Sequence, residues 1–232
     1  PIGMDYYSSR GRNISKTYSL QASAYAELQP IKNLRIKSQF GYRFSGDSYR
    51  SYTMKYRLSG GQYEDYDEMS QSMYLGHKIT WENTASYHFD INDEHVFDVV
   101  AGQSIEKWGM GEDISGTSAN SIFINDFDRA YLDNAKPEGM HQMSLGGAPS
   151  SQGALASFFG RVNYSIKDTY LFSATVRADG SSNFARGHRW GIFPSVSAGW
   201  ILTNEKWMQN ASSWLDFLKL RASWGQNGNA SI

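Results

Sequence analysis

The side chains in this sequence that could ligate a metal or move a proton do not gather into a motif. The acidic run Glu64–Glu68 offers hard oxygen ligands that suit Ca²⁺, although such a run is more often a solvated loop. Asp126 and Asp128 begin like an EF-hand loop, but Ala130 stands at the third ligand position, so the motif fails. The histidines are dispersed without the spacing of a metal site; they are His77, His88, His95, His141 and His188.

Nucleophile and cofactor motifs are missing as well. The chain has no Cys, which excludes disulfides, thiolate metal sites and cysteine nucleophiles. It contains no P-loop, no dinucleotide-binding glycine motif, no zinc-protease motif and no nucleophile elbow. We therefore predict that the chain is not an enzyme and that it has no catalytic, cofactor-binding or metal-binding residues.

Charge and hydropathy exclude two further classes of protein. The 232 residues carry a formal net charge of −1, which argues against a nucleic-acid partner, because phosphates require a basic face. Aromatic residues make up 15% of the chain, yet the mean hydropathy is −0.54. No apolar run approaches the roughly 20 residues of a transmembrane helix. A helical membrane protein is excluded, and the many aromatic residues need another explanation.

The two ends of the sequence also carry information. Pro1–Asp5 shows neither the basic nor the apolar region of a signal peptide. Gly225–Ile232 is a turn-like stretch directly after a predicted strand. We expect an internal piece of a longer protein, and the alternative is a processed domain with frayed ends.

Hydrophobic side chains alternate with polar ones along most of the chain. Tyr18, Leu20 and Ala22, for example, are separated by Ser19 and Gln21. A period of two is typical of β-strands and not of helices. We predict eight strands, within residues 18–28, 34–44, 73–89, 97–106, 156–166, 170–179, 192–202 and 218–225.

The predicted connections alternate between short and long. Short turns of polar residues follow Ile31, Ile91 and Ile166. Only the stretch around Asn204–Asn210 is better read as a helical turn, in a connection that is longer than the other short ones. Long excursions, which we predict to be external loops, span residues 46–72, 109–153 and 180–191. Short turns at one end of a sheet and long loops at the other are typical of an outer-membrane β-barrel.

Alternation alone does not distinguish a soluble β-sandwich from a membrane barrel. The apolar faces would meet in a core in the sandwich and would contact lipid in the barrel. Three features favour the barrel. Strands of about ten residues match a tilted membrane span, aromatic residues fall near strand ends, and Ala residues such as Ala174 and Ala198 suit lipid contact better than a packed core.

The polar faces of the predicted strands carry a set of basic side chains. In a barrel this face encloses water or a plug, and a small barrel has no room for so many charges, so they favour a large, 22-stranded, plugged barrel. The predicted lumen-facing residues are Arg35, Lys37, Arg43, Arg161, Arg177, Lys219 and Arg221.

Four sequence blocks in the second half carry a family resemblance. They are Phe159–Leu171, Val176–Phe184, Trp190–Trp200 and Trp214–Asn229. In this order they resemble the SusC/RagA-type TonB-dependent transporters of Bacteroidetes. The resemblance covers roughly residues 154–232, and the first half fits by its pattern alone. The plug domain, the TonB-contacting segment and the closing strands of that family are not in the sequence.

The resemblance implies that residues 1–232 are part of a TonB-dependent receptor barrel in the cell outer membrane. The fold class expected is all-β, an antiparallel up-and-down transmembrane barrel segment of about eight strands. The implied function is nutrient import of glycans or peptides, with this chain supplying barrel wall and loops. The implied partners are a SusD-like surface lipoprotein, the TonB complex acting through a plug domain, an oligosaccharide or peptide, and membrane lipid.

Two other hypotheses compete with this one. A secreted carbohydrate-binding β-sandwich could use exposed Tyr and Trp as stacking platforms, and it would be soluble without detergent. A hydrolase on a β-scaffold lacks any acid/base or nucleophile constellation.

The excursion at 109–153 is the strongest candidate for a partner surface. Loops longer than about 15 residues are usually functional or disordered, and a disordered loop would not hold so many large apolar side chains. Packing of the loop on itself and docking through Ile122–Leu132 remain open alternatives. The candidate contacts are Ile122, Phe123, Phe127 and Tyr131.

Overall fold

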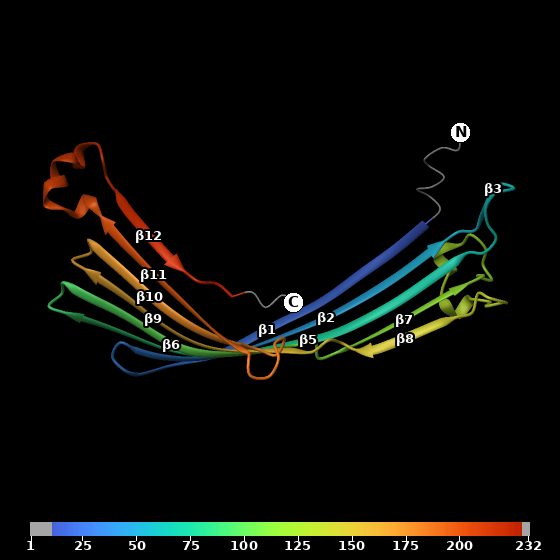
Figure 1. Ribbon diagram of the computed structural model, residues 1–232, viewed down its shortest axis with the longest axis horizontal. Helices are drawn as coiled ribbons and strands as arrows, with labels where there is room; N and C mark the ends of the chain where they lie inside the picture. The colour runs from blue at the N-terminus through green and yellow to red at the C-terminus, as the bar shows by residue number, and fades with distance from the viewer. Residues whose placement is uncertain (1–10, 229–232) are drawn as a thin grey trace. The chain divides into compact units, whose positions relative to one another are not determined.

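The computed structural model describes residues 11–228, apart from the side chains of residues 58, 211 and 212. These residues contain strands and short 3-10 helices but no α-helix, and the strand pairs that the structure registers are antiparallel (Figure 1). The main path of the large sheet is β1-β2-β5-β6-β9-β10-β11-β12, which does not close on itself within residues 11–228. This confirms the all-β, antiparallel fold class. Pro1–Asp5 and residues 229–232, on which the expectations about the ends partly depend, lie outside the described residues.

The eight strands of the main path correspond one to one to the eight predicted segments, and most are longer than predicted. They are β1 (Gly11–Ile31), β2 (Leu34–Thr53), β5 (Glu68–Ile91), β6 (His95–Trp108), β9 (Gly153–Ile166), β10 (Tyr170–Ser181), β11 (Trp190–Ile201) and β12 (Lys219–Gly225). Four further strands lie between them: β3 (Tyr56–Ser59), β4 (Gln62–Glu64), β7 (Glu112–Ala119) and β8 (Ser144–Pro149). The 3-10 helices are η1 (Phe127–Arg129), η2 (Leu132–Asn134), η3 (Leu202–Asn204) and η4 (Lys206–Ser213), the last two where a helical turn is predicted.

Turn chemistry explains the short connections. Asn92 and Asp93 have φ of 55° and 57°, and Lys167 and Asp168 both have φ of 50°. Two central residues with positive φ match the right-handed twist of a hairpin, and Asn and Asp tolerate this conformation better than other side chains. Neighbouring turns are joined by a bond from the Lys167 amide to the Glu94 carbonyl at 2.7 Å.

The excursion at 109–153 is a continuation of the sheet rather than a loop throughout. β5 pairs with β6 along Ile79–Ile91 and then with β7 along Glu68–Leu75. The chain runs from β6 to β7 through Gly109, whose φ of +70° favours glycine. At the point where β5 changes partner, the His77 amide donates a hydrogen bond to the Met110 carbonyl. β8 pairs with β7 in turn, so that only the residues between Ala119 and Ser144 form the tip of this hairpin.

The excursions at 46–72 and 180–191 are likewise shorter as loops than predicted. β2 continues to Thr53 and β5 begins at Glu68, while β10 ends at Ser181 and β11 begins at Trp190. The sequence of these extensions has no apolar alternation, so a search for a period of two does not indicate them as strands.

The described chain divides into two compact units. Unit 1 contains residues 11–21, 43–78 and 109–152, and unit 2 contains residues 22–42, 79–108 and 153–228. No helix in residues 11–228 has both the length and the apolar character needed to cross a membrane. Within these residues the buried apolar side chains belong to unit 1, and they are Tyr52, Met69, Ala119, Phe127 and Ala130.

Unit 2 therefore has no conventional core. Apart from the large sheet, the described residues form one small sheet of two strands, β3 and β4, which belongs to unit 1. No second sheet covers the apolar face of β9–β12 within residues 11–228. A soluble sandwich requires such a layer, so the carbohydrate-binding sandwich is not favoured.

Candidate functional site

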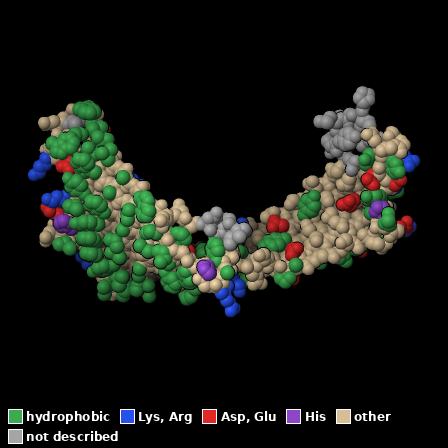
Figure 2. Space-filling model, in the orientation of Figure 1, with side chains coloured by type: hydrophobic (Ala, Val, Ile, Leu, Met, Phe, Trp, Pro, Cys, Tyr) green, Lys and Arg blue, Asp and Glu red, His purple; other side chains and the backbone are tan. Residues whose placement is uncertain are grey.

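The apolar face of unit 2 is more exposed than its polar face. Along β10 exposed and half-buried residues alternate, and the exposed ones are apolar: Phe172 and Val176 expose 45% and 54% of their surface. On β11 the same holds for Val196 at 51%, while the neighbouring Ser197 is half-buried. Figure 2 shows apolar side chains gathered over these strands. A sheet that faces water with its apolar side is unstable in water, and it is the arrangement that lipid requires.

Aromatic rings form a continuous row across four strands of this face. Phe89 stacks on Phe97 at 4.8 Å between ring centroids, Phe97 on Tyr164 at 4.4 Å, and Tyr164 on Phe172 at 6.2 Å. All four residues are in register near the short-turn end of their strands. The Tyr164 hydroxyl lies 2.8 Å from Nδ1 of His95, so that its polar end is hydrogen-bonded toward the turn. Amphipathic rings at one level of a barrel are typical of a membrane interface.

The opposite face of unit 2 holds three of the predicted basic residues around one depression. A pocket of about 340 Å³ is lined by Arg161, Lys219 and Arg221 together with hydroxyl and amide side chains. Nε of Arg161 donates to Oγ of Ser173 at 3.3 Å, and Asp98 also lines the pocket. Polar and charged side chains form much of the lining, so this face can remain hydrated or contact a polar partner.

The other predicted basic residues lie apart from this pocket. Nε of Arg177 donates to both oxygens of Asp179 at 2.7 and 2.9 Å, and Nη2 donates to Oγ of Ser157. Nζ of Lys37 lies 4.7 Å from the centroid of the Tyr25 ring. The two remaining members are placed in different units, Arg35 in unit 2 and Arg43 in unit 1.

Unit 1 carries a folded loop, which we name the tip loop (residues 120–135). Its apolar anchor is Phe127, which is 3% exposed and packs with Ala130 against Tyr52 and Met69 of the sheet. Met54 and Leu132 pack around this cluster. The tip loop is thus attached to the ends of β2 and β5 by a small core of its own.

A buried carboxylate is the polar anchor of the tip loop. Asp67 is 2% exposed, and it accepts hydrogen bonds from the Tyr52 hydroxyl at 2.7 Å and from the Ser121 amide at 2.8 Å. The Tyr52 oxygen in turn accepts from the Asn125 amide at 2.9 Å. A buried polar group is costly unless it is paired, so each of these groups constrains the others. Asn125 has φ of 56°, which an Asn tolerates.

Arg50 clamps the tip loop from the sheet. Its guanidinium donates to the carbonyl oxygens of Phe127 and Ala130 and lies 4.2 Å from the ring centroids of both Phe127 and Tyr131. Arg12 approaches the Phe127 ring at 4.7 Å. Planar guanidinium groups stack well on aromatic rings.

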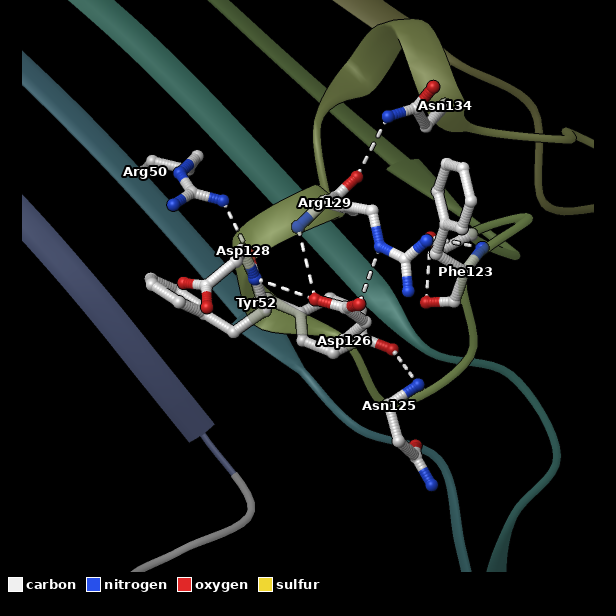
Figure 3. Close-up of polar contacts among 10 residues, drawn as sticks. Arg50, Tyr52, Phe123, Asn125, Asp126, Asp128, Arg129 and Asn134 are labelled. Atoms are coloured by element: carbon white, nitrogen blue, oxygen red, sulfur yellow. Dashed lines mark hydrogen bonds and ion pairs between the residues drawn. The ribbon is translucent and has the colours of Figure 1, made fainter.

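The first turn of η1 is capped within the loop itself (Figure 3). Oδ1 of Asp126 accepts from the amides of Asp128 and Arg129 at 3.0 and 3.2 Å, and its Oδ2 accepts from Nε of Arg129 at 2.6 Å. Hydrogen bonding from Arg129 lowers the pKa of Asp126, so the cap remains charged at neutral pH. The Arg129 guanidinium also lies 4.3 Å from the Phe123 ring. Asp126 is therefore the N-cap of η1.

The candidate contact residues of the loop separate into two kinds. Ile122 and Tyr131 are 57% and 42% exposed, and the neighbouring Ile124 is 59% exposed. Phe123 is half-buried beneath Arg129. Phe127 lies in the core, so in this conformation it packs the loop and offers no contact surface.

Members of the acidic run and several of the histidines contact other side chains of the protein. Asp67 is the buried anchor, while Asp65 lies 3.7 Å from Arg57 in an exposed ion pair. The ring of His141 lies 3.8 Å from that of Tyr66, and His88 contacts Asp98 at 2.7 Å. No group of three possible metal ligands gathers anywhere in residues 11–228.

Sequence reasoning missed Arg50, Tyr52 and Asp67 as the residues that hold the tip loop. Their partners in the tip loop lie 54 to 80 positions away, so no local spacing indicates them. The one available signal was the large number of apolar side chains in a long excursion.

Comparisons with known proteins agree with this geometry. The family model "TonB dependent receptor-like, beta-barrel" matches residues 1–231. TonB-dependent receptor P26 of Formosa agariphila is 30% identical over 230 residues, which are 95% of this chain and 22% of that protein. TonB-dependent receptor SusC of Bacteroides thetaiotaomicron is 44% identical over 85 residues, which are 37% of this chain and 8% of SusC.

Solved structures give the same result. The structure of the RagAB peptide transporter superposes with a TM-score of 0.78 at 27% identity, covering 98% of this chain and 24% of that one. The chain thus spans about a quarter or less of the length of these relatives. The matched family consists of receptors and not of enzymes. Because the family match extends over nearly the whole chain and the SusC and RagAB likenesses agree with it, the chain belongs to the TonB-dependent receptor β-barrel family of the outer membrane, in its SusC/RagA-type branch.

Proposed function

We propose that this chain supplies part of the wall and of the surface loops of a TonB-dependent importer for oligosaccharides or peptides. The observation that carries the proposal is the alternation of exposure in unit 2, where apolar side chains are the exposed ones. Lipid would cover this face, and the polar face would line the lumen. In this assignment residues 1–232 are part of one barrel domain, and the stretches 46–72, 109–153 and 180–191 lie on the external side.

The polar face would enclose a plug domain on which TonB acts. Arg161, Lys219 and Arg221 line one pocket and would present positive charge to the lumen. We assign Arg35, Lys37, Arg43 and Arg177 to the lumen side of their own strands as well. A folded plug with acidic groups, or a hydrated substrate path, fits such a wall, because charges there remain solvated or paired.

The tip loop would contact the SusD-like surface lipoprotein. Three exposed apolar side chains, Ile122, Ile124 and Tyr131, stand on a loop that Asp67 and Arg50 hold in place. A pre-organised loop loses little conformational entropy on binding, which suits a stable interface. RagAB is a peptide transporter and SusC is a TonB-dependent receptor, so import through a TonB-dependent barrel has a precedent among the proteins that this chain resembles.

The experiment uses the full-length protein with Ile122→Asp and Ile124→Asp combined, beside Met140→Asp as a matched control. Met140 is 95% exposed in the same unit but lies outside the tip loop. The double variant should reduce co-purification of the lipoprotein at least about tenfold, because two charges would enter an apolar contact. The control should bind as the wild type does.

Uptake of labelled oligosaccharide and peptide in the same strains tests the transport function itself. We expect uptake of one of them to require TonB and to fall in the double variant. Uptake that persists without TonB would contradict the proposed function. Wild-type lipoprotein binding by the double variant would instead reject the tip loop as the contact and leave transport intact.

A further inference from the structure

The connection between β11 and β12 differs from the other short turns. It spans residues 202–218 and contains η3 and η4, whereas the turns after Ile31, Ile91 and Ile166 comprise two or three residues. We name residues 202–217 the aromatic segment, because it contains Trp207, Trp214 and Phe217. A simple hairpin requires none of this length, so the segment needs another explanation.

The aromatic segment is fixed to the ends of the strands. Oε1 of Glu205 accepts from the Tyr170 hydroxyl at 2.6 Å and from Nε1 of Trp200 at 3.0 Å. Nδ2 of Asn204 donates to the Asp168 carbonyl at 2.7 Å. The hydrogen bond from Tyr170 lowers the pKa of Glu205, so the acceptor stays charged at neutral pH. The segment is therefore held in place rather than loosely attached.

The segment nevertheless exposes large aromatic side chains. Trp207, Trp214 and Phe217 are 61%, 76% and 62% exposed. They would be unfavourable in water, and the described residues around them do not cover them. Lys206 precedes Trp207 and is also exposed. Tryptophan together with a basic side chain is the combination typical of the headgroup region of a membrane.

Trp207 connects the aromatic segment to the apolar face of the sheet. Trp207 meets Trp200 edge to face at 6.4 Å, and Trp200 stacks on Tyr170 at 6.3 Å. Tyr170 and Trp200 are partners in the register of β10 and β11, on the same face as Phe172 and Val196. The ring row from Phe89 to Phe172 lies at this end of the strands. The aromatic segment therefore starts at the same end of the strands as the row of aromatic rings.

We propose that the aromatic segment lies in the headgroup region of the periplasmic leaflet, with Trp207 and Trp214 inserted between phospholipids. This inference rests on the proposed assignment of the apolar face to lipid. The occupant is lipid rather than a protein partner, because the surface extends the face that we assign to lipid. Lys206 would lie near lipid phosphates. The segment would thus fix the height of β11 and β12 in the membrane.

The test uses single-cysteine variants of the full-length protein, labelled with the fluorophore NBD and reconstituted in phosphatidylethanolamine–phosphatidylglycerol nanodiscs. Trp207→Cys and Trp214→Cys report on the segment, and Val196→Cys reports on the sheet face. Gln209→Cys is the control, because Gln209 is exposed and, with three residues per turn, does not share the face of Trp207 on η4. One quencher is a phospholipid with a nitroxide near its headgroup, and the other is iodide in water. Labels at 207 and 214 should be quenched by the lipid several-fold more strongly than the label at 209, and iodide should show the reverse order.

The outcomes separate the inference from the assignment on which it rests. Strong iodide quenching at 207 and 214, together with lipid quenching at 196, would overturn the inference and leave the sheet face in lipid. A label at 196 that only iodide reaches would reject the face assignment and the inference together. Because the labels replace tryptophans, a second readout uses the combined Trp207→Phe and Trp214→Phe variant without label. Brominated lipid should quench a smaller fraction of its tryptophan emission than in the wild type, and equal fractions would contradict the inference.

Discussion

Full-length protein carrying Val196→Arg is expected to fail in barrel assembly, whereas Ser197→Arg is expected to assemble. Val196 lies on the apolar face of β11, opposite Ala174 and Trp224, and is 51% exposed. An arginine on the lipid face near the middle of the membrane costs about 2–4 kcal/mol, because lipid offers the charge neither water nor a counter-ion. This corresponds to roughly 30-fold or more in the folding equilibrium.

Ser197 is the matched control because it adjoins Val196 in sequence and differs in the face it occupies. Its partners across the sheet are Ser173 and Ser223, and it lines the polar pocket. The measurement is the heat-modifiable shift in gel mobility that folded outer-membrane barrels show, together with the amount of protein in the outer membrane. Equal loss in both variants would reject the face assignment.

Phe127→Ala is expected to release the tip loop while leaving the barrel assembled. The side chain fills a small core with Tyr52, Met69 and Ala130, and removing a buried phenylalanine costs about 3–5 kcal/mol. The same change removes the ring on which Arg50 and Arg12 lie. The small core and the polar contacts of Asp67 and Arg50 hold the tip loop but not the main strands of the sheet, so the loss should appear as local opening.

Limited proteolysis of the full-length protein measures this opening. Cleavage within residues 120–135 should accelerate at least about tenfold in Phe127→Ala, while heat-modifiability remains that of the wild type. Ile122→Ala is the control, because Ile122 is exposed and outside the core. Wild-type cleavage in Phe127→Ala would show that the core does not hold the loop.

The sheet could be predicted from the sequence wherever one face of a strand is apolar. The alternation around Phe172, Ala174 and Val176 shows that the two faces of the strand meet different surroundings, one apolar and one polar. Alternation of this kind located all eight strands of the main path. The resemblance of the second half then indicated the family, which the comparisons confirm. Whether the complete barrel has 22 strands remains a prediction.

The parts that could not be predicted are of two kinds. Some are strands whose two faces are equally polar, and others are held by residues far apart in the sequence. Glu112–Ala119 forms β7, yet its sequence is polar on both faces and therefore shows no period of two. The tip loop depends on Asp67, whose partner Ser121 is 54 positions away. An Asp within an acidic run is usually solvated, so the neighbouring residues give no indication that Asp67 is buried.

The lipid contact of the apolar face is tested most directly by a nitroxide scan along β11 in the full-length protein in a bilayer. Single spin labels from Ile192 to Trp200 are compared for collision with oxygen, which enters lipid, and with a nickel chelate, which stays in water. Labels at Ile192, Val196 and Ala198 should favour oxygen, and labels at Ser195 and Ser197 should favour nickel, with a period of two along the strand. Equal access of the nickel chelate to both sets, or the opposite alternation, would contradict the assignment of this chain's apolar face to lipid.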